Sequence, residues 1–273
     1  MVNEIPMRSQ ASYREENFAR RQAGGLFTEM ESFFGPEFWG LDEMHLLGHG
    51  QSKLLYGMLE QKYNHVGCVV ELAPFKLING ATLPKIGAAM ERSRPFIPSD
   101  FSENWSDIHK HHGNYRAVDW YDFLLYVIPT LVTPNLNEAS AFALNSLVQG
   151  LTIAASWAVR PQELPLMSAL FQAWHVFLKY QVDQQTLAIR VFPVTQHYIG
   201  HIEYIVKKMG PLPAISCRSL ERSIGSYTRN NPVYISNLVE TTTLVNHIRS
   251  TINSSTTKIM PTVLVDLDAG VDW

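Results

Sequence analysis

Large apolar side chains recur at spacings of three and four residues between Leu164 and Val182, and this period is the strongest constraint on the fold. Such a run places its large side chains on one face of a helix. Two more apolar segments, 119–131 and 137–159, are long enough to form helices and are also predicted to be helical. Nowhere do strand-like and helix-like segments alternate in the way that builds a parallel sheet. We therefore predict a mainly α fold with at most a few short strands. The residues that share the first face are Met167, Leu170, Phe171, Trp174, Phe177 and Leu178.

Proline and glycine divide the rest of the chain into shorter elements. Gly48 and Gly50 weaken the first half of an apolar run at 41–59, so its helix is expected to begin near Ser52. Gly210-Pro211 is a helix-stop pair. These signals predict helices at 84–92, 195–209 and 219–229, and one short edge strand at 188–194.

Composition and the positions of helix-breaking residues also indicate the expected domain organisation. We expect a polar lead-in at 1–37, a helical domain at 38–229 and a loosely held C-terminal extension at 230–273. There are 22 Lys and Arg against 25 Asp and Glu, a balance that does not by itself indicate a strong nucleic-acid binder. The two cysteines exclude a disulfide-rich scaffold and a cysteine-only zinc finger, and no secretory signal opens the chain, so we expect an intracellular protein.

Two apolar segments require a membrane check. The segment 123–132 is short and contains Pro129, and the segment 139–159 contains Asn145 and Gln149. A membrane-spanning helix needs about 20 predominantly apolar residues. Both segments are therefore predicted to be buried core helices, and no membrane partner is expected.

The first candidate cluster lies at 41–50, where Asp42, Glu43, His45 and His49 occur within eight residues. A carboxylate beside a histidine can bind a divalent metal ion or move a proton. The alternative is a solvated turn before a helix, with Asp42 capping it.

The second candidate is the pair His197 and His201, which are four residues apart. This spacing binds zinc on a helix in HExxH sites, but Tyr198 occupies the position of the glutamate, which disfavours a zinc protease. The alternative is a histidine pair that packs or forms hydrogen bonds at the edge of the core.

The third candidate is a strip of arginines at 218–229. Arg218, Arg222 and Arg229 can share one side of a helix and could meet phosphates, with Glu221 between them. The alternative is an ordinary helix surface with weak local ion pairs. Asp119 suits the first turn of a helix and is interpreted as structural.

The sequence contains none of the glycine-rich, nucleophile-elbow or CxxC signatures, so no small-molecule cofactor is expected.

Three ordered blocks between about Phe38 and Arg229 together resemble one protein family. GLDEMHLLGHGQSKLL is similar to the DxMHxxxxGxxKxL stretch of CACTA-type (En/Spm-like) DNA transposases. YRAVDWYDFLLYVIPTLV is similar to core helices of that family, particularly the fungal versions. QHYIGHIEYIVKKMGPLPAISCRSLERSIGSYTR resembles the HxxxH, GPL and ExxiG region at the C-terminal end of these transposases.

This resemblance implies an RNase H-like transposase core interrupted by a helical insertion, in which three acidic residues bind Mg²⁺ or Mn²⁺ for phosphoryl transfer. It assigns Asp42 and Glu221 as candidate catalytic and metal-binding acids and His45 as a supporting residue. It assigns Arg218 and Arg222 to DNA phosphates. His197 and His201 match the paired histidines and are further candidates for metal ligands.

The resemblance also implies what the chain lacks. Such a transposase has an upstream zinc-binding part and the first half of the sheet, with the first acid, and the chain has no counterpart of them ahead of Asp42. We therefore expect a C-terminal transposase fragment, catalytically incomplete alone, whose partners are DNA or a full-length transposase in the nucleus. The alternatives are a domesticated helical module that binds proteins, and an independent metal-binding enzyme that also uses His49.

Overall fold

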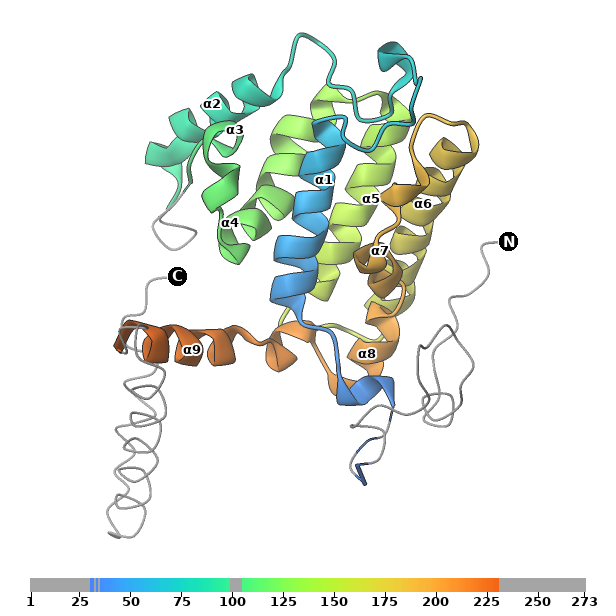
Figure 1. Cartoon of the computed structure of the whole chain (residues 1–273). Helices are drawn as coiled ribbons and strands as arrows, with labels where there is room; N and C mark the ends of the chain where they lie inside the picture. Colours follow the sequence, from blue (N-terminus) through green and yellow to red (C-terminus); the bar gives the residue numbers. More distant parts are fainter. Residues whose placement is uncertain (1–29, 32, 34, 99–104, 231–273) are drawn as a thin grey trace, which may run out of the picture. The chain divides into compact units, whose positions relative to one another are not determined.

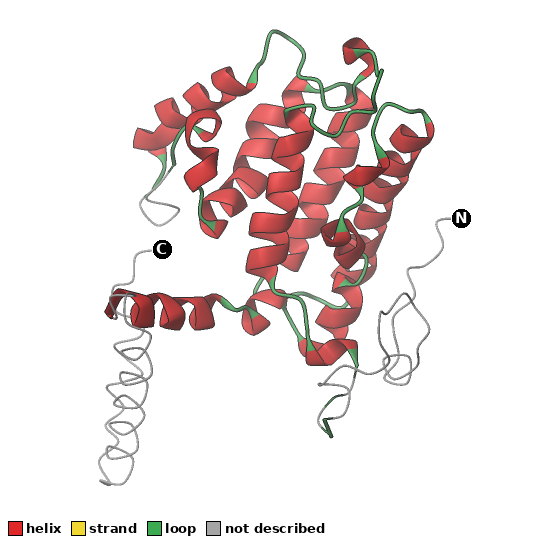
Figure 2. Ribbon diagram, viewed as in Figure 1, coloured by secondary structure: helices red, strands yellow, loops and turns green. Residues whose placement is uncertain are grey.

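The computed structural model describes residues 30, 31, 33, 35–98 and 105–230 (Figure 1). The chain divides into two compact units, Met1–Ser216 and Cys217–Trp273, and each is described by itself. The described residues are mainly helical, as Figure 2 shows, and an antiparallel bridge between Asn64 and Leu187 is the one β-pairing among them. The prediction of a mainly α fold is confirmed.

The elements follow one another with short connections. The α-helices of the first unit are α1 (Ser52–Leu59), α2 (Leu83–Ser93), α3 (Ile108–His111), α4 (Ala117–Asp122), α5 (Glu138–Ala154), α6 (Glu163–Asp183), α7 (Val194–Ile199) and α8 (Ile202–Met209). Helix α9 (Arg218–Asn230) belongs to the second unit. Two further segments are π-helices, η4 (Met44–Gln51) and η8 (Phe123–Val132). Short 3₁₀ turns are η3 (Pro36–Phe38), η5 (Val70–Leu72), η6 (Arg94–Phe96), η7 (His112–Asn114), η9 (Thr133–Asn135), η10 (Ile189–Val191) and η11 (Leu212–Ile215).

The core of the first unit is built from side chains of α1, η8, α5 and α6 among others, and α5 packs along α6 (Figure 1). Trp120, Trp174 and Phe123 are almost completely buried in it. Burial of a large apolar side chain of this kind contributes about 1.5–3 kcal/mol. Helices α5 and α6 approach closely at Gly150, where a Cβ atom would lie 2.5 Å from the ring of Phe171. The apolar face predicted within 164–182 is the face of α6 that covers this core.

The two π-helices pack around α4. In η8, Pro129 has no backbone N–H to donate, which favours departure from regular α-helical bonding. In η4, Gly48 lies against α4 so closely that a Cβ atom would be 2.7 Å from the carbonyl oxygen of Ala117. The hydroxyl of Ser52 donates to the carbonyl of Leu47 at 2.8 Å, which satisfies an acceptor inside the core.

Most predicted helices are present. Helices α2, α5, α6 and α9 occupy the predicted segments, and α1 begins at Ser52 as expected. The first half of that run is a π-helix rather than a weakened α-helix. No described helix is both long enough and apolar enough to span a bilayer. The predicted lead-in up to residue 29 and the extension from residue 231 lie outside the described residues.

Two predictions are wrong. The segment 188–194 is not a strand, because Val191 N–H bonds back to the carbonyl of Ala188 and forms the turn η10. Its pairing with the chain near Tyr63 is limited to the bridge region. The segment 195–209 is not one helix, because it breaks at Gly200 between α7 and α8.

Candidate functional site

Asp42 and His45 form a hydrogen-bonded pair at the start of η4. The ring Nδ1 of His45 donates to Oδ2 of Asp42 at 2.5 Å, and the backbone N–H of His45 donates to the same oxygen at 2.8 Å. The Asp42 side chain is 15% exposed and that of His45 is 54% exposed. The carboxylate therefore caps the start of η4 and also orients the imidazole ring.

A distant part of the chain also contacts Asp42. The hydroxyl of Ser216 donates to Oδ1 of Asp42 at 3.3 Å. Nearby, a Cβ atom at Gly40 would lie 3.5 Å from the Met209 side chain and 3.6 Å from Ile215. The phenol of Tyr204 donates to the Glu37 carboxylate. The beginning of the first block and the region around η11 are thus one packed corner of the first unit.

His49 lies one turn further along η4. Its ring centroid is 6.3 Å from that of His45. Burial, and then the positive field of Lys53, lower the pKa of His49. A ring held neutral in this way keeps a lone pair available but carries no charge to pair with a phosphate.

His197 and His201 converge although they lie on different elements. His197 is in the last turn of α7 and His201 precedes α8. Their Nε2 atoms are 3.0 Å apart, and their rings are nearly perpendicular. Burial, followed by the neighbouring His197, lowers the pKa of His201 to about 4. The predicted proximity of the pair is therefore present, but a turn at Gly200 produces it, not a continuous helix.

The arginine strip and Glu221 belong to the second unit. Arg218 and Arg222 are partly exposed on α9, and Glu221 is exposed. The backbone N–H of Glu221 donates to the carbonyl of Cys217 at 2.9 Å, which starts the helix. The assignment of Glu221 as a partner of Asp42 in metal binding remains a prediction from the family resemblance, since the two acids lie in different units.

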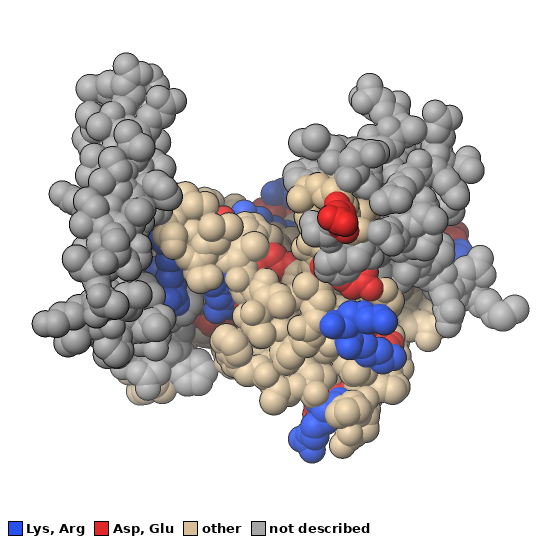
Figure 3. Space-filling view, turned by 90° about the horizontal axis from the view of Figure 1, so that it is seen from below, with Lys and Arg blue, Asp and Glu red and all other residues tan. Residues whose placement is uncertain are grey.

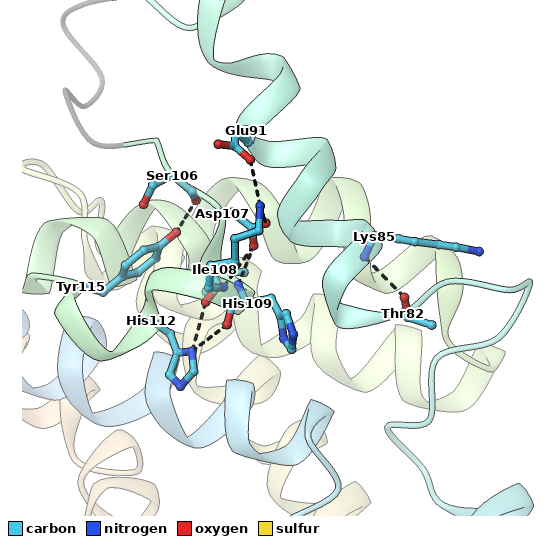
Figure 4. A network of polar contacts seen from close by, with 10 residues as sticks. Thr82, Lys85, Glu91, Ser106, Asp107, Ile108, His109, His112 and Tyr115 are labelled. Carbon is cyan, nitrogen blue, oxygen red and sulfur yellow. Dashed lines mark hydrogen bonds and ion pairs between the residues drawn. The ribbon is translucent and has the colours of Figure 1, made fainter.

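Two buried polar networks were not foreseen. One is centred on Asp107, which caps α3 by accepting from the backbone N–H groups of His109 and Lys110 and pairs with the Lys110 side chain at 3.1 Å (Figure 4). Gly87 provides the space for this carboxylate, because a Cβ atom there would lie 1.8 Å from Oδ1 of Asp107. Burial by itself raises the pKa of Asp107. The hydrogen bonds from Lys110 and His109 and the positive charge of Lys110 outweigh this effect, so the pKa is lowered. The role of Asp107 is structural.

The other network is centred on Gln196 of α7. Its side-chain oxygen accepts from the indole of Trp174 at 3.0 Å and contacts Nε2 of His175 at 3.2 Å. Its amide nitrogen donates to the side-chain oxygen of Gln51 at 3.2 Å. Burial lowers the pKa of His175. This network links η4, α6 and α7, and the sequence offered no signal for it beyond a glutamine between Val194 and Ile199.

On the face shown in Figure 3, Lys and Arg form separate small groups on a largely uncharged described surface. Within the described ranges, no group of three or more His, Cys, Asp or Glu side chains is arranged to hold a metal ion.

Comparisons with protein families, curated proteins and solved structures found no match to the chain.

Proposed function

We propose that the chain is a transposase-derived protein whose helical unit corresponds to the C-terminal part of a CACTA-type DNA transposase. The contact between Ser216 and Asp42 is the observation that carries this proposal. It joins the first and third blocks of the family resemblance. The middle block packs against the first through α4, which contacts η4, and η4 contains half of the first block. The first block, the middle block and the part of the third block up to Ser216 therefore lie in one folded unit, which is what common descent would produce.

The chemistry of this proposal is metal-dependent phosphoryl transfer. Asp42 supplies carboxylate oxygens, the ligand type that Mg²⁺ and Mn²⁺ prefer. Both oxygens already accept hydrogen bonds, so an ion would have to exchange for the 3.3 Å contact with Ser216. His45 would hold the carboxylate in place during that exchange. A bound ion would supply charge stabilisation at the transferred phosphoryl group.

The family's reaction uses three acids, and Asp42 and Glu221 account for two. We therefore propose that the chain is catalytically incomplete unless a third acid is supplied. In this proposal Arg218 and Arg222 contact DNA phosphates and position the duplex without reading its sequence. In this proposal the protein acts in the nucleus, where it would bind a DNA substrate or a full-length transposase.

The DNA contact can be tested by fluorescence anisotropy with a labelled duplex at several salt concentrations. We expect salt-dependent binding that weakens in an Arg218→Ala/Arg222→Ala variant, with the slope of log K against log salt reduced by about 1 per lost phosphate contact. Arg160→Ala is the matched control, since Arg160 is an exposed arginine paired with Glu163. Equal slopes for the wild type and the double variant would contradict the assignment.

A second candidate is a domesticated module that binds another protein. Exposed apolar side chains in the segment 66–72 favour it, including Val66 at 94% and Leu72 at 67% exposure. Ile189, at 72% exposure, lies on a segment tied to the same loop by the hydrogen bond from His65 N–H to the Thr186 carbonyl. Apolar groups gathered in this way are typical of protein-binding surfaces.

This candidate predicts that a purified CACTA-type transposase binds the chain and that Leu72→Ser/Ile189→Ser removes the binding. Trp157→Ser is the control, because Trp157 is equally exposed in a different loop. Binding that survives the double variant would exclude this surface. Biolayer interferometry would measure both variants against the immobilised transposase.

A further inference from the structure

The pair His197 and His201 has a geometry that the proposed function does not use. Their Nε2 atoms lie 3.0 Å apart, with ring centroids separated by 4.6 Å and an interplanar angle of 81°. At this distance the Nε2–H of one ring donates a hydrogen bond to Nε2 of the other. The contact brings two imidazole nitrogens together near the surface, since His197 is exposed and His201 is half-buried.

The separation is close to what a metal ion requires. Zinc binds imidazole nitrogen at about 2.0–2.1 Å, so two ligands of a tetrahedral ion are about 3.3–3.4 Å apart. The two rings need to open by only a few tenths of an ångström, which a small side-chain rotation supplies. Imidazole nitrogens suit zinc, nickel and copper, whereas magnesium and manganese prefer oxygen. This pair therefore differs in chemistry from the acidic residues of the proposed function.

The backbone holds the pair together before any ion binds. Gly200 N–H bonds to the carbonyl of His197 at 3.1 Å, and His201 N–H bonds to the carbonyl of Tyr198 at 3.0 Å. This tight turn connects the last turn of α7, which contains His197, to His201 at the start of α8. The positive end of the α8 dipole opposes a cation there, and the carboxylate of Glu203 in the first turn, which is paired with the Lys207 side chain, offsets it only in part. Preorganised ligands lose less conformational entropy on binding.

We propose that His197 and His201 form a binding site for a zinc-class divalent ion, coordinated through both Nε2 atoms. Solvent fills the remaining coordination positions. The site is open and exchangeable, unlike a structural site closed by four protein ligands. It stands independently of any activity on DNA.

Isothermal titration of the full chain with ZnCl₂ tests the proposal. The wild type is expected to show one saturable site, and His197→Ala and His201→Ala are each expected to weaken it at least tenfold. Loss of an outer-shell partner already costs about 10–100-fold in metal affinity, so loss of a direct ligand costs no less. His109→Ala is the matched control, since His109 is an exposed histidine on α3, and it is expected to leave the site unchanged.

Imidazole ¹H–¹⁵N spectra give a second measurement that does not depend on affinity. Zinc should shift the Nε2 resonances of His197 and His201 together and at the same stoichiometry. Circular dichroism of each variant verifies that it folds, and the exposed position of His197 makes that variant the decisive one. Absence of a saturable site in the wild type, or an undiminished site in folded His197→Ala, would overturn the proposal.

Discussion

The hydroxyl of Ser216 lies 3.3 Å from Oδ1 of Asp42, although 174 residues separate the two in the chain. This hydrogen bond connects the beginning of η4 with the end of the first unit. It also fixes the carboxylate that pairs with His45. The candidate acid is therefore positioned by tertiary structure as well as by the local cap.

Removing the hydroxyl should destabilise this corner. We expect Ser216→Ala to lower the free energy of unfolding by about 0.5–1.5 kcal/mol, the usual net value of one hydrogen bond. Urea unfolding measures the change, and Ser219→Ala, at an exposed position on α9, serves as the control. Identical unfolding midpoints for the two variants would show that the contact contributes nothing.

The close packing of η4 on α4 gives a second prediction. Gly48→Ala places a Cβ atom 2.7 Å from the carbonyl oxygen of Ala117, and that backbone oxygen cannot rotate away. Overpacking of this kind costs about 1–3 kcal/mol. Gly113→Ala is the matched control, because a Cβ atom there meets nothing within 4 Å. A thermal unfolding midpoint for Gly48→Ala at or above that of Gly113→Ala would refute the packing argument.

The buried amide of Gln196 gives a third prediction. Gln196→Ala leaves the indole N–H of Trp174 and the side-chain oxygen of Gln51 without their partner. Each buried polar group left unpaired costs about 1–3 kcal/mol, so the loss of partners for two groups should cost about 2–6 kcal/mol of stability. Chemical denaturation followed by Trp fluorescence measures it. Gln172→Ala, an exposed glutamine of α6, should change stability by less than about 0.5 kcal/mol. Equal effects of the two substitutions would exclude the network as a source of stability.

Histidine burial predicts the direction of the pH dependence. The pKa of His201 is lowered from 6.5 to about 4 in the folded protein, because burial and His197 disfavour its charged form. Between pH 6.5 and 4 the unfolded chain binds a proton at this residue that the folded chain does not. Stability should therefore fall as the pH is lowered through this window, and the lowered pKa values of His49 and His175 act in the same direction.

His201→Gln should flatten this dependence. The measurement is the urea midpoint at several pH values between 7 and 4, compared between the wild type and the variant. His109→Gln, at an exposed position on α3, is the matched control. A variant as acid-sensitive as the wild type would show that protonation of His201 does not contribute.

The helical fold was predictable because its main signals are local. The apolar period of 164–182 and the Gly210-Pro211 stop act within a few residues. The π-helices were not predictable in the same way, since η4 depends on how closely Gly48 approaches α4. The segment 188–194 has strand-like composition, but the chain turns there at η10, just before α7, whose Gln196 bonds to Trp174 of α6. Tertiary contacts decided these elements, not intrinsic propensity.

The same distinction between local and long-range interactions applies to the candidate site. The Asp42 and His45 pair could be predicted because a cap at a spacing of three residues is a local interaction. The contact with Ser216 could not, because it spans most of the chain. Buried Gln196 and Asp107 are ordinary polar residues in the sequence, and only the surrounding packing makes them buried groups.

Calorimetric titration with Mn²⁺ tests the central claim, that Asp42 and Glu221 serve metal-dependent chemistry, most directly. The wild type, Asp42→Ala and Glu221→Ala would be compared, with Asp183→Ala as a control at an exposed acid paired with Lys179. The account predicts saturable Mn²⁺ binding that is lost in both site variants and retained in the control. Absence of binding in the wild type, or binding that neither site variant diminishes, would contradict it.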